Sequence, residues 1–211
     1  HRMCGENIVK NRRLFEKRGS LPRMRGKHNP GGIYRLPPRI TPAHAGKTIQ
    51  LCFKHRPTRC RGSFFIDDYQ FERVWNDPYT DIERLREFPC ALTPDFSLYL
   101  DMPMAMKIWN VYRSRLIGQM MQDAGIVVIP TLSWAEPETF SFCFEGLEQG
   151  GVVAVSTVGV MRNKSAQEVW AAGMNEAVQR LRPSGILCYG SRPDYDFGSV
   201  PVRFVSARKF G

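Results

Sequence analysis

Short hydrophobic runs alternate with helical repeats of apolar residues from about residue 61 to the end of the chain. Each run is bounded by turn-forming residues, a pattern that predicts a buried strand. Apolar residues between the runs recur at spacings of three and four, which is typical of helices that pack on one face. The expected strands lie at 63–68, 91–97, 125–132, 152–158, 185–191 and 202–205.

Three helices are expected between these strands. The longest begins near Asp101, which would cap it, and ends at Gly125. Its expected apolar stripe is Met104, Ile108, Val111, Tyr112 and Leu116. A second helix begins at Pro137. A third follows Ser165, which opens a capping box, and ends before Pro183.

Alternation of strands and helices predicts an α/β fold with a mostly parallel sheet of about six strands covered by helices. An open doubly wound sheet and a TIM-barrel-like or partial barrel both fit this order, and we favour the barrel-like arrangement. Both architectures place functional residues at the carboxyl ends of the strands.

The positive charge of the chain is concentrated at one end. Residues 1–60 carry a net charge of +13 and residues 61–211 carry −3, which together give the overall +10. Residues 1–60 also lack helical or strand periodicity and are interrupted by proline and glycine. We therefore expect an irregular, disordered or poorly packed basic segment at 1–60 and an α/β domain at 61–211, with nucleic-acid binding only through the basic segment.

Two further features of the sequence concern where the protein works. No apolar run approaches the length that crosses a membrane, so no membrane span is expected. The six cysteines show no disulfide framework, and Cys143 and Cys188 lie in apolar segments where burial is expected. A reducing cytoplasm is the expected location.

Three strings near the start look like one DNA repeat read in three frames. These strings are residues 1–7, 19–27 and 39–48. A single GC-rich nucleotide sequence with an inverted repeat encodes the third string, encodes the second with one change at Leu21, and encodes five of the seven residues of the first. The distance in nucleotides between successive strings is constant when the shift of the reading frame from one string to the next is included. Residues 1–48 therefore resemble a translated CRISPR repeat–spacer array.

Several longer strings from the rest of the chain occur together, and in the same order, in a known family. These strings are FIDDYQFERVWNDP (65–78), TPDFSLYLDMP (93–103), IWNVYRSR (108–115), GIVVIPTLSW (125–134), FCFEGL (142–147), VAVSTVG (153–159) and YGSRP (189–193). Residues 63–193 thus resemble the family of phage and mobile-element proteins catalogued as domain of unknown function 4417. The resemblance implies a phage or mobile-element origin and no particular activity.

Polar residues follow the predicted strands. We expect five of them to share the carboxyl edge of a parallel sheet as candidate catalytic residues: Asp67, Asp95, Glu136, Thr157 and Tyr189. Carboxylates there suit a general acid/base pair, and Asp67 with Asp95 suits Mg²⁺ or Mn²⁺. The alternative is that such residues only cap helices or form turns, as Glu136 would beside its proline.

The long helix carries a second candidate group. Asn110 and Arg113 are three residues apart on one face, and Arg115 is near. They would bind an anion or lie on a solvated or ion-paired face. No histidine occurs after His55, so residues 61–211 have no histidine base and no Ser–His triad. Phosphate-binding glycine loops and metalloprotease motifs are also missing.

Two functions remain open from the sequence. One is an enzyme that acts on a phosphorylated or nucleotide-like substrate through a rim of carboxylates, with Mg²⁺ or Mn²⁺ as its expected cofactor. The other is a non-catalytic phage accessory protein that binds a host or phage partner.

Overall fold

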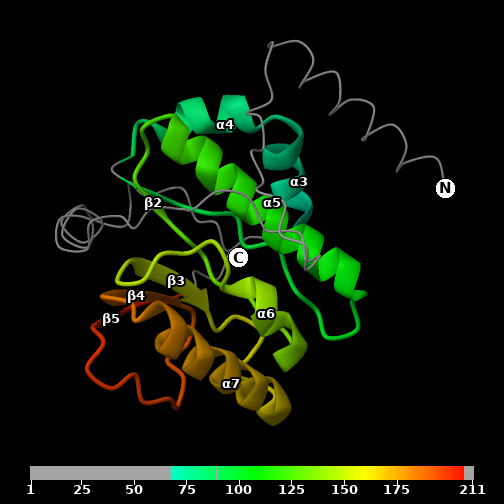
Figure 1. Ribbon diagram of the computed structural model, residues 1–211, viewed down its shortest axis with the longest axis vertical. Coiled ribbons are helices and arrows are strands. Elements are labelled where there is room, and N and C mark those ends of the chain that lie inside the picture. Colours follow the sequence, from blue (N-terminus) through cyan, green and yellow to red (C-terminus); the bar gives the residue numbers. More distant parts are fainter. Residues whose placement is uncertain (1–67, 89, 207–211) are drawn as a thin grey trace, which may run out of the picture.

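The computed structural model describes residues 68–88 and 90–206, which fold as helices around short parallel strands (Figure 1). The elements are α3 (Asp68–Asn76), α4 (Pro78–Leu85), β1 (Ala91–Leu92), α5 (Met104–Asp123), β2 (Val128–Ile129), the 3₁₀ turn η1 (Pro137–Thr139), α6 (Phe140–Cys143), β3 (Val152–Ser156), α7 (Lys164–Leu181), β4 (Gly185–Tyr189) and β5 (Val202–Val205). The predicted α/β fold is confirmed.

All five described strands run parallel and lie in the order of the chain. β1 pairs with β2, and β3, β4 and β5 form a second sheet in that order. A parallel bridge between Thr131 and Ala154 joins the two sheets. There Leu132 N–H donates to Ala154 O at 2.8 Å, and Ala154 N–H donates to Pro130 O at 2.9 Å.

The six-stranded, barrel-like sheet that we expected is not confirmed. Five strands form sheets of two and three strands, and these sheets do not close into a barrel within residues 68–88 and 90–206. Residues 63–67 of the expected first strand lie outside the described residues. Asp68 begins α3 instead, because Phe71, Val74 and Trp75 follow at helical spacing.

Two of the expected strands are much shorter than their hydrophobic runs. β1 and β2 have two residues each, although the apolar runs span 91–97 and 125–132. Pro94 and Pro130 interrupt the runs, and proline has no backbone N–H to donate to a neighbouring strand. The expected strands near 152, 185 and 202 contain no such proline and form as β3, β4 and β5.

The helix caps differ in detail from those expected. α7 is capped by Asn163, whose side-chain oxygen accepts from Ser165 N–H at 2.9 Å, so Ser165 is not the cap. α5 follows Pro103 without a side-chain cap, so Asp101 does not cap it. The sequence prediction omitted α4, which is capped by Asp77 and has Pro78 in its first turn.

The first half of α5 buries a different face from the predicted stripe, of which only Val111 is buried in this half. Met104 and Ile108 of the expected buried stripe are exposed, as is Met106 (52%). The residues that this half buries include Lys107 (2% exposed) and Asn110. Polar and charged side chains therefore form the inner face of this half of the helix.

Ordinary apolar packing holds the rest of the structure. One core lies between α3, α4 and the second half of α5, where Phe71, Ile117 and Met121 are fully buried. The other lies between α7 and the sheet of β3, β4 and β5 (Figure 1), around Met174 and Val155. Burial of apolar surface in these two cores stabilises the folded chain.

Cys143 and Cys188 are both fully buried, as the sequence predicted. Burial in apolar surroundings raises the pKa of Cys143 to about 12 and that of Cys188 to about 11. Both thiols are therefore protonated at neutral pH and are poor nucleophiles. Within the part of the chain that the structure describes, no helix combines the length and the apolar character that crossing a membrane requires.

We expect Gly173→Ala to destabilise the protein. Gly173 on α7 lies against the indole of Trp134, and an added Cβ would overlap that ring. Trp134 also packs against Trp170 and Phe144, so it has little room to move. The free energy of unfolding, measured by urea titration, should fall by about 1–3 kcal/mol. The exposed control Gln179→Ala should change it by less than about 0.5 kcal/mol; an equal effect of both changes would contradict this packing.

Candidate functional site

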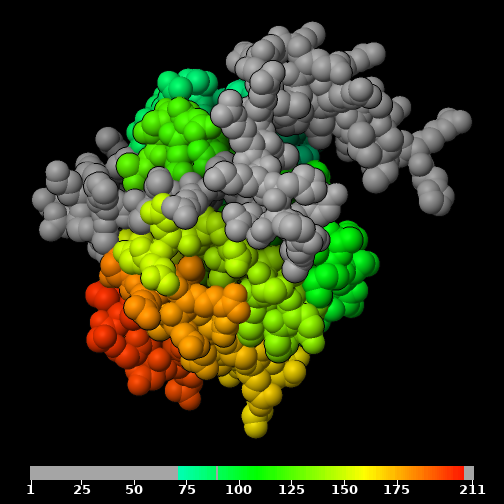
Figure 2. Space-filling view, in the orientation of Figure 1, coloured from blue at the N-terminus to red at the C-terminus, as the bar shows by residue number. Residues whose placement is uncertain are grey.

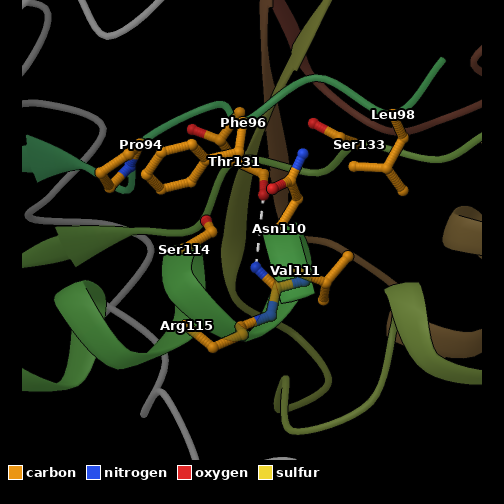
Figure 3. A pocket seen from close by; sticks show the side chains of 9 residues that line it. All are labelled: Pro94, Phe96, Leu98, Asn110, Val111, Ser114, Arg115, Thr131 and Ser133. Carbon is orange, nitrogen blue, oxygen red and sulfur yellow. Dashed lines mark hydrogen bonds between the residues drawn. The ribbon is translucent and has the colours of Figure 1, made fainter. Parts of the chain in front are cut away.

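A small pocket lies where the segments that follow β1 and β2 meet the inner face of α5 (Figure 3). It contains about 210 Å³ of empty space, part of which is open to solvent, and its centre has room for roughly one water molecule. The lining residues are Pro94, Phe96, Leu98, Asn110, Val111, Ser114, Arg115, Thr131 and Ser133. The pocket is therefore at the carboxyl ends of the first two strands, where parallel sheets usually carry sites.

Asp95 and Ser133 meet at this pocket. Asp95 follows β1 and Ser133 follows β2, and the Ser133 hydroxyl donates a hydrogen bond to Asp95 Oδ1. Both residues are half-buried, so each keeps some contact with solvent. Of the five predicted catalytic residues, Asp95 is the one whose described contacts place it directly beside the pocket.

A buried network of hydroxyl groups fixes the geometry between the two strands. Thr131 N–H donates to Thr93 Oγ1 at 2.9 Å, and Thr131 Oγ1 donates to Thr93 O at 2.8 Å. Ser114 of α5 is hydrogen-bonded to Thr93 Oγ1 at 3.2 Å. These bonds tie β1, the segment after β2 and α5 together below the pocket, so Asp95 and Ser133 are attached to a rigid base.

Arg113 is held beside the pocket by several partners. Its guanidinium forms an ion pair with Glu72 of α3 and donates to Asn110 Oδ1 at 2.6 Å. It also lies over the ring of Phe96, 3.9 Å from the centroid. The Asn110 amide in turn donates to Ser97 O at 2.8 Å. The sequence prediction of an ion-paired face for Arg113 is confirmed, and a solvated face is wrong, because Asn110 and Arg113 are buried.

Arg115 is the most deeply buried arginine of the helix, with 3% of its surface exposed. It donates to Cys143 O at 2.7 Å and to Thr131 O at 3.3 Å, the bond drawn in Figure 3. Its Nε–H is buried and has no hydrogen-bond partner among the described residues. Burial lowers the pKa of Arg115 to about 10, so the guanidinium is still charged at neutral pH.

The buried Lys107 forms an ion pair with the half-buried Glu136, one of the predicted site residues. Lys107 Nζ lies 2.6 Å from both carboxylate oxygens and also donates to Leu100 O at 3.1 Å. The hydrogen bond from Lys107 lowers the pKa of Glu136 below its usual value. Glu136 precedes η1 but its side chain does not cap that turn. Its carboxylate holds the lysine instead.

Thr157 and Tyr189 lie further along the same edge of the sheet, after β3 and at the end of β4. The Thr157 hydroxyl donates to Ser191 O at 2.7 Å, and Thr157 N–H donates to Tyr189 O at 2.9 Å. Neither residue lines the pocket. The structure thus places them as neighbours on adjacent strands, and the hydroxyl of Thr157 is used to hold the loop that begins at Ser191.

The predicted metal pair cannot be placed, because Asp67 lies outside the described residues. Among residues 68–88 and 90–206, no group of three or more Asp, Glu, His or Cys side chains is arranged to hold a metal ion. Asp67, and the Mg²⁺ or Mn²⁺ that it would hold with Asp95, therefore stay predictions.

The sequence analysis missed Lys107, Ser114 and the threonines of the network. One signal was present: Lys107, Asn110 and Ser114 recur at spacings of three and four on α5. Polar residues at that spacing mark one helix face as clearly as apolar residues do. The prediction took the apolar stripe as the buried one.

Comparison with known proteins assigns the chain to a family. The family model described as "Domain of unknown function (DUF4417)" matches residues 44–206. The chain belongs to this family. The DUF4417 match contains all five predicted catalytic residues and every residue of the pocket. It starts at residue 44, upstream of the domain boundary expected at residue 60, and includes only the last five residues of the segment that resembles a repeat array.

Two proteins that are similar to this chain come from mycobacteriophages. The chain is 45% identical over 138 residues to the Gene 1 protein of Mycobacterium phage L5, which is 65% of this chain and 60% of that protein. It is 48% identical over 127 residues to the Gene 1 protein of Mycobacterium phage D29, which is 60% of this chain and 47% of that protein. The chain thus spans about half the length of these relatives. No solved structure matches the chain.

We expect Glu136→Gln to destabilise the protein, because it leaves the Lys107 ammonium buried without a carboxylate. The free energy of unfolding at pH 7 should fall by about 2–4 kcal/mol. Lys107→Met together with Glu136→Gln should recover part of this loss, since no buried charge remains. Urea titrations of the wild type and these variants measure the effect, and equal losses in the single and double variants would contradict it.

The ion pair of Lys107 and Glu136 makes the stability of the folded protein depend on pH. The pKa of Glu136 is lower in the folded protein than in the unfolded chain, where it is about 4.3. Its contribution to stability is therefore complete above that unfolded pKa and is lost as the pH falls through the folded pKa. Between pH 7 and pH 3, the wild type should lose more stability than Glu136→Gln; parallel curves would contradict this assignment.

Proposed function

We propose that the protein is an enzyme that acts on a phosphorylated or nucleotide-like substrate at the pocket between α5 and the ends of β1 and β2. The observation that carries this proposal is the hydrogen-bonded pair of Asp95 and Ser133 at the pocket. Another wall of this pocket is formed by α5, from which the buried Arg115 lines the pocket and the buried Arg113 lies beside it. The pocket thus has a carboxylate that can accept a proton, Asp95, on one side and a positively charged guanidinium on another.

Asp95 would act as the general base. A carboxylate that accepts a hydrogen bond from a hydroxyl can take the proton of an attacking hydroxyl or water. This role needs no histidine, and none occurs between residue 61 and the end of the chain. Arg113 and Arg115 would stabilise negative charge that develops on the phosphoryl oxygens in the transition state. Ser133 would position Asp95 and the substrate.

The remaining predicted residues have supporting parts in this proposal. Glu136 would keep Lys107 charged and fixed at the end of α5 that lies near the pocket. Thr157 and Tyr189 would extend the binding surface along the edge of the sheet towards β4. A divalent cation would bind Asp95 together with Asp67, which immediately precedes α3 in the sequence.

The second candidate function is a non-catalytic accessory protein that binds a phage or host partner. It is favoured by an exposed apolar surface at the start of α5: Tyr99, Leu100, Met106 and Trp109 are 46–58% exposed. Aromatic residues and methionine are enriched in protein interfaces. Under either function we keep the division into a basic segment, residues 1–60, and an α/β domain, residues 61–211, with nucleic-acid contact assigned to the basic segment.

Ligand-dependent thermal stabilisation tests the enzyme proposal. Nucleoside mono-, di- and triphosphates, each with and without Mg²⁺ or Mn²⁺, would be added to the purified protein and the melting temperature measured. A ligand that binds the folded state should raise the melting temperature by about 3 °C or more at ten times its Kd.

Asp95→Asn keeps the shape of the side chain and removes its charge. We expect this variant to retain binding or weaken it modestly and to lose turnover of the stabilising compound by at least about 100-fold. Asp194→Asn, at an exposed position beyond β4, is the matched control and should turn over the compound as the wild type does. If no phosphorylated compound stabilises the wild type, the enzyme proposal is wrong. If Asp95→Asn keeps full turnover, Asp95 is not the general base.

A further inference from the structure

Three buried cations of α5 differ in how their charge is balanced. Lys107 is paired with Glu136, and Arg113 is paired with Glu72. Arg115 forms no ion pair with a described residue, although it is 97% buried. Only backbone carbonyls of Thr131 and Cys143 accept from it. One buried positive charge on this helix is thus left without a negative partner.

A buried guanidinium without a carboxylate partner destabilises the folded state unless another group compensates its charge. Removing an ion from water costs several kcal/mol, and neutral carbonyl groups return only a part of that. The Nε–H of Arg115 adds to the cost, because it is buried without any acceptor among the described residues. A ligand that supplies the missing charge and acceptors is one reason why such groups are retained in proteins.

The unbalanced charge lies at the pocket and not elsewhere in the core. In Figure 3 the guanidinium of Arg115 points in among the other lining side chains, below Asn110 and Thr131. Ser114 and Ser133 add hydroxyl groups to the same lining. The size of the pocket admits a small group and excludes a base or a sugar ring. The enclosed centre has room for roughly one water molecule, so one oxygen of an oxyanion would enter it and the other atoms would lie in the part that is open to solvent.

We infer that Arg115 holds the phosphoryl group of the substrate, with Ser114 and Ser133 as its hydroxyl neighbours in the pocket. This inference rests on the proposed function and assigns one part of the substrate to one part of the site. Arginine suits the role because its planar fork of N–H groups matches phosphate oxygens, whereas lysine offers a single point charge. The phosphoryl group would then lie between Arg115 and the Asp95–Ser133 pair, with the rest of the substrate outside the pocket.

Inorganic phosphate, a nucleoside monophosphate and the matching nucleoside are the probes. Thermal shift and ³¹P NMR line broadening would be measured on the full chain against sodium chloride of equal ionic strength. Phosphate and the monophosphate should stabilise the wild type, and the nucleoside should bind at least tenfold more weakly. If neither phosphate compound binds better than chloride up to 50 mM, the inference is wrong.

Two pairs of variants locate the binding. Arg115→Lys should weaken phosphate at least tenfold, while Arg180→Lys, at an exposed arginine of α7, should leave it unchanged. Leu98→Glu, at a half-buried lining position, should also weaken phosphate tenfold by repulsion, while Leu98→Gln should not. If Arg115→Lys does not fold, the comparison of Leu98→Glu with Leu98→Gln alone tests whether phosphate binds in the pocket. Wild-type affinity in both Arg115→Lys and Leu98→Glu would overturn the inference.

Failure of the inference and failure of the proposed function give different results. If a nucleotide is turned over in an Asp95-dependent way but binds Arg115→Lys and Leu98→Glu as tightly as the wild type, the assignment of Arg115 is wrong and the enzyme proposal stands. If phosphate binds through Arg115 but no phosphorylated compound is turned over, the anion site stands and the enzyme proposal falls.

Discussion

Three positive charges are buried along α5, and their pairing constrains the segments that form the pocket. Lys107, Arg113 and Arg115 point inward from one helix, and each must find partners, because a buried cation without them destabilises the fold. The partners come from α3, from the segment before η1 and from the ends of β2 and α6. These contacts fix where the connecting segments lie, and so they determine where Asp95 and Ser133 meet.

Sequence patterns predicted the half of the fold that is held by apolar packing. β3, β4, β5 and α7 follow their hydrophobic patterns closely, because their cores contain only apolar side chains. The prediction failed for the first half of α5. That segment has apolar residues on more than one side, because Met106 lies two positions from both Met104 and Ile108, so periodicity alone does not say which face is inside. The buried pair of Lys107 and Glu136 decides it, and these residues are 29 positions apart in the chain.

The candidate site was predictable only in part, for the same reason. Asp95 was found because it follows an apolar run. The contact of Asp95 with Ser133 requires the pairing of β1 with β2. The positions of the arginine side chains require the orientation of α5. Thr157 and Tyr189 were correctly expected on one edge of a parallel sheet, but that edge continues past the pocket. Periodicity gives the edge of a sheet, whereas the position of a pocket along it depends on side-chain contacts between distant segments.

The positions of the buried cations and of the pocket follow from the orientation of α5, which site-specific thiol labelling can measure. Met106→Cys and Ser114→Cys would be labelled in the folded protein, and the labelling of each peptide followed by mass spectrometry. We predict that the thiol at 106 reacts at nearly the rate of an unfolded peptide, and that the thiol at 114 reacts at least 100-fold more slowly. Rapid labelling at 114 together with protection at 106 would contradict this orientation of the helix.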